Sequence, residues 1–183
     1  MTALRPTVTA PAPLTDLVAG LGLVGDVTAE VSVGGITLSS QDVEPGWLYV
    51  ALPGSRRHGA EFAGSAVDSG AVAILTDDAG ALIYADHAVP VVVADDVRAA
   101  MATVAARLFE EPGKALTTFG VTGTNGKTTT VALIRAGLAA DGRLAGTIGT
   151  IGFRLGDEEL RSGRSTVTTP ESPDPQALLA VMR

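Results

Sequence analysis

Short apolar runs of strand length alternate with longer stretches of helical period over the first 110 residues. The apolar runs are residues 47–52, 71–75 and 90–94. Helices are predicted over residues 14–22, 60–69 and 95–109. Residues 31–38 alternate apolar and polar side chains around Gly34 and Gly35, which predicts a hairpin. Val-rich strands that alternate with helices are typical of an α/β domain with a parallel sheet.

The stretch E-E-P-G-K-A, residues 110–115, interrupts this pattern because proline ends a helix and glycine follows it. We therefore predict a disordered lead over residues 1–13, a first domain over 14–112 and the start of a second domain, with a parallel sheet, over 113–183. That second domain is predicted to contain a strand, a helix after a glycine loop, another strand and a last helix. Their ranges are 116–121, 127–140, 144–153 and 176–183. Because these elements are too few to close a parallel sheet, we expect either a piece of a longer protein or a domain completed by a second copy.

Composition narrows the functional classes. The 183 residues contain no cysteine and two histidines, which excludes thiolate sites and argues against a multi-histidine metal site. A formal net charge of −7 and an aromatic content of 4% argue against a nucleic-acid partner. No apolar run reaches the roughly 18 residues of a membrane span, and the N-terminus lacks an apolar signal core. We therefore expect a cytoplasmic protein without membrane contact. We also expect the protein to be a monomer.

The stretch V-T-G-T-N-G-K-T-T-T, residues 121–130, carries the clearest chemistry. Glycines after an apolar strand let backbone N–H groups approach an anion, and the following helix points its unpaired N–H groups at the same place. The P-loop template G-x-x-x-x-G-K-[S/T] fits at Gly126, Lys127 and Thr128, but Val121 stands where its first glycine belongs. In this interpretation Lys127 neutralises the β- and γ-phosphates of ATP, and Thr128 is a ligand of Mg²⁺. The alternative is an ordinary strand–turn–helix connection with a solvated lysine.

This loop resembles the ATP-binding loop of the Mur ligases, whose form T-G-T-x-G-K-[S/T] accounts for Val121. The resemblance implies a set of ATP-binding residues, of which Lys127 is also the catalytic residue. The set is Gly123, Thr124, Asn125, Gly126, Lys127, Thr128 and Thr129. Folylpolyglutamate and cyanophycin synthetases use similar loops, so the loop alone does not choose among these ligases.

Two further stretches resemble segments of Mur ligases. Residues 38–54, L-S-S-Q-D-V-E-P-G-W-L-Y-V-A-L-P-G, resemble the uridine-binding segment D-S-R-x-x-x-P-G-x-L-F-x-A-x-x-G, from which Ser39 and Gln41 depart. Residues 166–173, T-V-T-T-P-E-S-P, resemble the T-T-P-E segment of the member that adds a diamino acid. The implied contacts of the UDP-MurNAc peptide are Leu38, Ser40, Ser55, Arg56, Arg57, Thr168 and Thr169. Without the resemblance, these residues would be assigned to a turn, a solvated loop and a strand before a proline.

The resemblance implies an ATP-dependent ligase of peptidoglycan precursor synthesis, with ATP and Mg²⁺ as cofactors. Such an enzyme phosphorylates the terminal carboxylate of UDP-MurNAc-L-Ala-D-Glu, and the amine of meso-diaminopimelate or L-lysine attacks the acyl phosphate. The Ala-, Gly- and Val-rich composition and the stretches L-T-D-D-A-G and T-I-G-T-I-G resemble those of actinobacterial members, and this resemblance favours diaminopimelate. The alternatives are the member that adds D-Ala-D-Ala, a non-catalytic nucleotide-binding relative, and a P-loop NTPase coupled to motion. Residues 1–183 alone are predicted to show no turnover.

Overall fold

The computed structural model describes residues 10–21, 30–85, 88–160 and 171–183. They form two compact units that divide in the sequence between Glu110 and Glu111, and each unit is described separately. Residues 1–9 of the predicted disordered lead lie outside the described residues. Of its remainder, Ala12–Pro13 form strand β1, which pairs antiparallel with β2 (Ser32–Val33).

The first unit contains a four-stranded parallel sheet, and three of its strands lie in the apolar runs that the sequence predicts as strands. Its strands are β3 (Gly35–Thr37), β4 (Trp47–Val50), β5 (Ala71–Thr76) and β6 (Val91–Val93), in the spatial order β3-β4-β5-β6. Each neighbouring pair is parallel, so the carboxyl ends of all four strands lie at one edge. The loops that follow the strands therefore gather at that edge.

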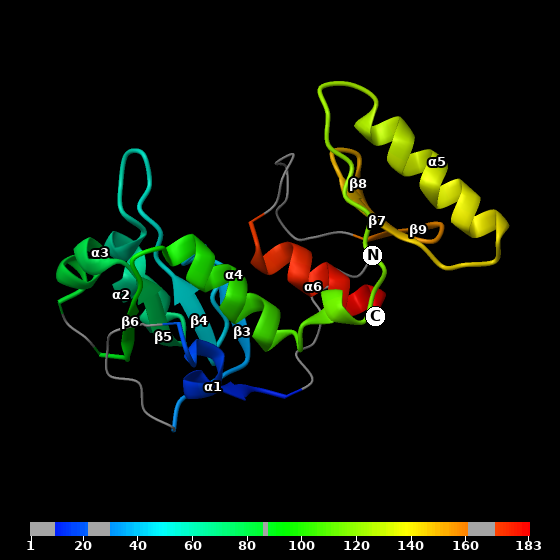
Figure 1. Ribbon diagram of the computed structural model, residues 1–183. Coiled ribbons are helices and arrows are strands. Elements are labelled where there is room, and N and C mark those ends of the chain that lie inside the picture. Colours follow the sequence, from blue (N-terminus) through cyan, green and yellow to red (C-terminus); the bar gives the residue numbers. More distant parts are fainter. Residues whose placement is uncertain (1–9, 22–29, 86–87, 161–170) are drawn as a thin grey trace. The chain divides into compact units, whose positions relative to one another are not determined.

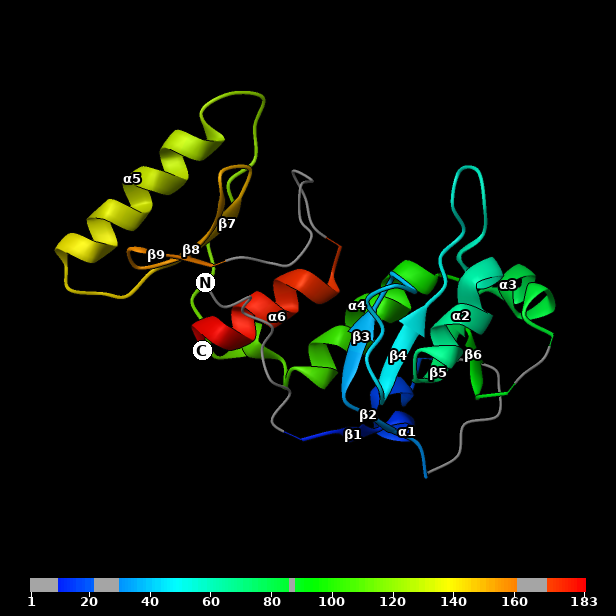
Figure 2. The same ribbon diagram turned by 180° about the vertical axis from the view of Figure 1, so that it is seen from behind.

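Helices cover both faces of this sheet (Figures 1 and 2). One face carries α1 (Leu14–Val18) and α4 (Val97–Leu108). The other carries the 3₁₀ helix η1 (Gly59–Phe62), α2 (Ala63–Asp68) and α3 (Asp78–Ile83). Successive strand residues point to opposite faces, so Leu48 and Val50 of β4 belong to the core under α4, whereas Tyr49 belongs to the core under α2.

The hairpin predicted over residues 31–38 is wrong. Its first half pairs with β1, whereas its second half enters the parallel sheet beside β4. Between the halves, the Gly34 N–H donates a hydrogen bond to the Gly46 carbonyl at 2.8 Å. A β-carbon on Gly35 would collide with the Trp47 indole. Gly35 therefore permits the close approach of Trp47, and the two glycines do not form a hairpin turn.

The second unit contains helices and one small antiparallel sheet. Its elements are η2 (Pro112–Lys114), α5 (Lys127–Ala140), β7 (Gly146–Gly149), β8 (Gly152–Leu155), β9 (Glu158–Leu160) and α6 (Pro173–Met182). The strands pair in the order β7-β8-β9. Phe153, Leu160 and Leu178 form its small buried core.

Three predicted elements of this unit differ from the structure. Residues 116–121 form no strand, and no described strand lies beside them to share hydrogen bonds. The single strand predicted over 144–153 is a hairpin, in which Gly152 adopts φ 102° as the chain reverses. Helix α6 begins at Pro173 rather than at residue 176, because the first helical turn tolerates proline. Helix α5 has the predicted bounds.

Candidate functional site

The glycine loop lies at the amino end of α5, where the sequence predicts a phosphate site. Gly123 has φ 149° and Gly126 has φ 79°. A β-carbon on Gly126 would meet no atom within 4 Å, and one on Gly123 would make an ordinary 3.6 Å contact with the Asn125 carbonyl oxygen. Both residues are therefore glycines because of their left-handed backbone and not for lack of space. The open space beside them leaves room for a ligand.

The first turn of α5 offers donors and positive charge to an anion. The helix has 14 residues, and no side chain caps its amino end. Its first N–H groups are thus available, and the helix dipole favours negative charge there. The Lys127 ammonium donates a hydrogen bond to the Gly123 carbonyl, so the charge lies beside the loop. Backbone and side chain together suit a polyphosphate.

These residues fit ATP with Mg²⁺. Mg²⁺ takes oxygen ligands, and it is usually bound through one or two protein groups together with phosphates and waters. The exposed Thr128 hydroxyl in the first turn of α5 is one such oxygen. Across the described residues, no group of three acidic, histidine or cysteine side chains could hold a metal ion by itself. A magnesium ion here would therefore depend on the nucleotide for most of its ligands.

Two predicted substrate segments lie at the carboxyl edge of the parallel sheet. Leu38 and Ser40 follow β3, and Ser55, Arg56 and Arg57 follow β4, its neighbour in the sheet. The loop after β4 projects beyond the strands (Figures 1 and 2). Crevices outside the carboxyl ends of parallel strands are frequent ligand sites. The structure thus brings these five residues to one edge of one unit.

Leu38 and Ser40 differ in their surroundings. Leu38 packs against the core beneath α1 and α4. Ser40 is half-buried in the turn that follows, and its side chain has no hydrogen-bond partner among the described residues. The Ser40 hydroxyl is therefore available to a ligand, whereas Leu38 contributes to the fold.

The two arginines of the loop after β4 also differ. Arg57 Nε donates to Glu61 Oε2 at 2.8 Å, and the guanidinium lies 4.5 Å from the centre of the Phe62 ring. Hydrogen bonds from the Arg57 side chain and from the His58 backbone hold the pKa of the Glu61 carboxyl below its usual value. Arg56 is exposed, and it has no ion pair or hydrogen bond within the part of the chain that the structure describes. Arg56 is therefore the arginine whose donors are available to a diphosphate.

Hydrogen bonds anchor the base of this loop. The Gly59 N–H donates to the Leu52 carbonyl at 2.9 Å, and the Tyr49 hydroxyl donates to the Gly59 carbonyl at 2.9 Å. Burial raises the pKa of the Tyr49 phenol, so it remains a protonated donor. His58 Nε2 lies 3.0 Å from Oδ1 of Asp77, the residue that directly follows β5.

Sequence reasoning missed Asp77 and helix α3. The Asp77 carboxylate is the N-cap of α3 and accepts a hydrogen bond from the Gly80 N–H at 2.8 Å. An aspartate just before a helical stretch is a start signal, which could have located this helix. The signal was obscured because the segment T-D-D directly continues a buried strand.

Residues 166–170 of the third predicted substrate segment, which include Thr168 and Thr169, lie outside the described residues, and so does His87. The described chain resumes at Glu171, two residues before α6 begins. The roles assigned to Thr168 and Thr169 stay predictions.

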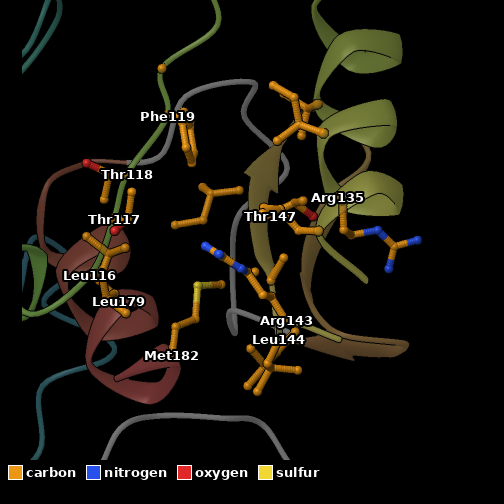
Figure 3. A pocket seen from close by; sticks show the side chains of 18 of the residues that line it. Leu116, Thr117, Thr118, Phe119, Arg135, Arg143, Leu144, Thr147, Leu179 and Met182 are labelled. Atoms are coloured by element: carbon orange, nitrogen blue, oxygen red, sulfur yellow. The ribbon is translucent and has the colours of Figure 1, made fainter. Parts of the chain in front are cut away.

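A cavity of about 570 Å³ lies within the second unit (Figure 3). Residues 116–121, with side chains of β7 and α6, form part of its wall, and α5 contributes Val131, Ile134 and Leu138. Residues 123–129 do not line it, so it is distinct from the phosphate loop. No residue of α5 is buried. The side of α5 that faces the cavity is half-buried, and the rest of the helix is exposed.

Comparison with protein families identifies the chain. A model described as Mur ligase family, catalytic domain, matches residues 32–108, and a model described as Mur ligase middle domain matches residues 121–183. The chain belongs to the Mur ligase family. The resemblance inferred from the glycine loop and the uridine-type segment is thereby confirmed.

Curated relatives match this Mur ligase chain along nearly its whole length. It is 47% identical over 180 residues to the UDP-N-acetylmuramoyl-L-alanyl-D-glutamate–2,6-diaminopimelate ligase of Streptomyces coelicolor, covering 98% of this chain and 34% of that protein. It is 47% identical over 183 residues to the UDP-N-acetylmuramyl-tripeptide synthetase of Leifsonia xyli subsp. xyli, covering 99% and 35%. The chain spans about a third of the length of the curated relatives it matches.

A solved structure supports the fold of this Mur ligase chain. A UDP-N-acetylmuramoyl-L-alanyl-D-glutamate–2,6-diaminopimelate ligase structure superposes with a TM-score of 0.71 at 21% identity, covering 94% of this chain and 33% of that one. The predicted α/β class is confirmed, and its parallel sheet lies in the first unit. The sheet described within residues 111–183 is antiparallel instead. None of the helices in the described ranges is both long and apolar enough to cross a membrane.

Proposed function

We propose that this Mur ligase chain belongs to an ATP-dependent ligase that adds 2,6-diaminopimelate to UDP-MurNAc-L-Ala-D-Glu in the cytoplasm, as a monomer. The observation that carries the proposal is the loop of Gly123 and Gly126 at the amino end of α5 with the Lys127 ammonium beside it. The names of relatives at 47% identity support the choice of reaction and of amino acid. At the carboxyl edge of the first unit, Ser40 and Arg56 offer donors suited to a uridine nucleotide.

The reaction joins a carboxylate to an amine, so the carboxylate must first be activated. Transfer of the γ-phosphoryl group of ATP to the carboxylate gives an acyl phosphate and ADP. Attack of the amine on the acyl carbon then forms the amide and releases inorganic phosphate. Positioning and charge neutralisation carry most of the rate in such phosphoryl transfers. In this proposal Lys127 and the first N–H groups of α5 bind the β- and γ-phosphate oxygens, and Thr128 holds Mg²⁺.

An ADP-release assay on the full-length protein tests the proposed reaction. The protein is given ATP, Mg²⁺, UDP-MurNAc-L-Ala-D-Glu and either meso-diaminopimelate or L-lysine. ADP release that needs both the UDP substrate and meso-diaminopimelate supports the proposal. Release with L-lysine alone would correct the amino acid, and release only with the UDP-tripeptide and D-Ala-D-Ala would assign the other family member. Nucleotide binding without ADP release under any condition would mark a non-catalytic relative.

The difference between the two loop arginines leads to a prediction on substrate affinity. Arg56→Ala is expected to raise the KM for the UDP substrate about 10- to 100-fold, since a hydrogen bond to a charged group contributes roughly 1.5–3 kcal/mol. Arg57→Ala is expected to raise it only about twofold, because Arg57 already binds Glu61 at the surface. Isothermal titration with UDP and with uridine checks the cause, because only UDP affinity should fall in Arg56→Ala. Equal losses in both variants would contradict the distinction.

A further inference from the structure

The loop after β4 has few contacts of its own. Residues 53–57 are all exposed, and their backbone makes no hydrogen bond with the rest of the described backbone apart from an isolated bridge between Pro53 and His58. A β-carbon on Gly54 would collide with the Arg57 carbonyl, so the loop turns back tightly on itself. The conformation of the segment that carries Arg56 is therefore fixed mainly at its base.

His58 is the side chain that fixes the carboxyl side of this base. Its Nδ1 accepts a hydrogen bond from the Ala60 N–H at 3.0 Å, as the cap of η1. Because Nδ1 is an acceptor, the ring proton lies on Nε2, which donates to Asp77 Oδ1 at 3.0 Å. Both ring nitrogens are thus engaged, which suits a structural contact and leaves no nitrogen for proton transfer.

Asp77 connects the loop to the neighbouring strand. The same oxygen, Oδ1, accepts from the Gly80 N–H at 2.8 Å and from His58. A β-carbon at position 80 would lie 2.6 Å from His58 Cε1, so the missing side chain of Gly80 makes room for the imidazole. The side chains of His58 and Asp77 are 12% and 25% exposed, which shields this hydrogen bond from much of the solvent.

We infer that His58 and Asp77 are a positioning pair that holds the loop of Arg56 in the conformation that accepts the uridine nucleotide. The inference rests on the function proposed above. The pair joins the loop after β4 to the start of α3, and both lie at the carboxyl edge of the sheet. In this inference neither residue touches the nucleotide, and both affect its binding only through the conformation of the loop.

Two substitutions separate this link from the helix caps. His58→Asn keeps an oxygen that can cap η1, but its side chain is too short to reach Asp77. Asp77→Ser keeps an oxygen that can cap α3, but its side chain is too short to reach His58. Asp96→Ser is the matched control, because Asp96 caps α4 through the Ala99 N–H at 2.9 Å and forms no hydrogen bond with the loop within the described residues. Asp77→Asn keeps an acceptor for both partners and is the conservative variant.

The test measures UDP affinity by titration calorimetry and steady-state kinetics in the full-length protein. His58→Asn and Asp77→Ser are each expected to weaken UDP binding and to raise the KM for the UDP substrate about tenfold, with kcat and the KM for ATP within about twofold. The double variant should be no weaker than either single one, because both remove the same interaction. Asp96→Ser and Asp77→Asn should stay within about threefold of the parent protein.

Several outcomes would overturn the inference. They are unchanged UDP affinity in both variants, additive losses in the double variant, or a joint fall of kcat, ATP affinity and melting temperature, which indicates general destabilisation. If Asp77→Ser does not fold, His58→Asn alone decides. A parent protein that binds no UDP overturns the inference as well. A parent protein that binds UDP but performs no ligation overturns only the proposed reaction, and the affinities of the variants still test the pair.

Discussion

Lys127→Ala in the full-length protein is expected to lower kcat/KM for ligation about 100- to 1,000-fold, the usual effect of removing one group that stabilises charge in a transition state. The Lys127 ammonium lies beside Gly123 at the start of α5, where the phosphates of ATP are proposed to bind. Charge develops on the oxygens of the transferring phosphoryl group, and no other lysine of the sequence lies in this loop. ADP release under saturating UDP substrate and amino acid measures the loss.

Lys114→Ala is the matched control for this prediction. Lys114 is the other lysine of the sequence, and its ammonium pairs with Glu111 at 2.7 Å on the surface. Such exposed pairs contribute at most about 1 kcal/mol, so activity should stay within about twofold. Activity of Lys127→Ala above about a tenth of the parent value would be too high for a group with this role.

Gly80→Ala is expected to lower the free energy of unfolding of the first unit by about 2 to 3 kcal/mol. The added methyl group would overlap Thr76 Oγ1 and press on the His58 ring. Thr76 cannot give way easily, because it is fully buried and its hydroxyl donates to the Ala51 carbonyl at 2.9 Å. Urea unfolding followed by the fluorescence of Trp47, the single tryptophan of the sequence, reports on this unit.

Gly64→Ala provides the contrast for Gly80→Ala. Gly64 lies in α2 of the same unit, and a β-carbon there would meet no atom within 4 Å. Alanine is the better helix former, so the substitution should leave stability unchanged or raise it by up to about 1 kcal/mol. Similar losses in the two variants would show that the crowding around Thr76 and His58 is not the cause.

Much of the first unit could be predicted because its signals are local. Buried parallel strands such as 71–75 are continuous apolar runs, and the helix over 95–109 carries a capping aspartate at Asp96. The pairing of residues 31–38 could not be predicted in the same way. It depends on Gly35 fitting against Trp47, a residue twelve positions away whose ring position no local pattern specifies.

The predicted strand over 116–121 failed for a different reason. A strand needs a neighbour to take its hydrogen bonds, and no described strand pairs with this segment. The apolar pattern of residues 116–121 describes only their own side chains. It does not identify a second strand with which they could pair. The relatives are about three times as long as this chain. A structure of the same length as these relatives would show whether a strand pairs with residues 116–121.

In the candidate site, too, local features could be predicted and contacts between distant residues could not. The loop of residues 123–129 could be located from glycine spacing alone, because left-handed glycines and a helix start are local features. The sequence offered no way to tell Arg56 from Arg57, since the difference arises from the contacts of Arg57 with Glu61 and Phe62. Nor could it join His58 to Asp77, which lie 19 residues apart and meet only when β4 and β5 pair.

Helix α5 has no buried residue, and this has a consequence for folding during synthesis. The first unit encloses apolar cores on both faces of its sheet, whereas α5 buries none of its residues. Phe119, Leu133 and Leu144 of the second unit are 64%, 68% and 74% exposed. The nascent chain leaves the ribosome amino end first, so residues 10–110 can complete their cores early. The apolar side of α5 is still in contact with water at that stage. Residues 111–183 are therefore the part of the nascent chain on which we expect chaperones to act.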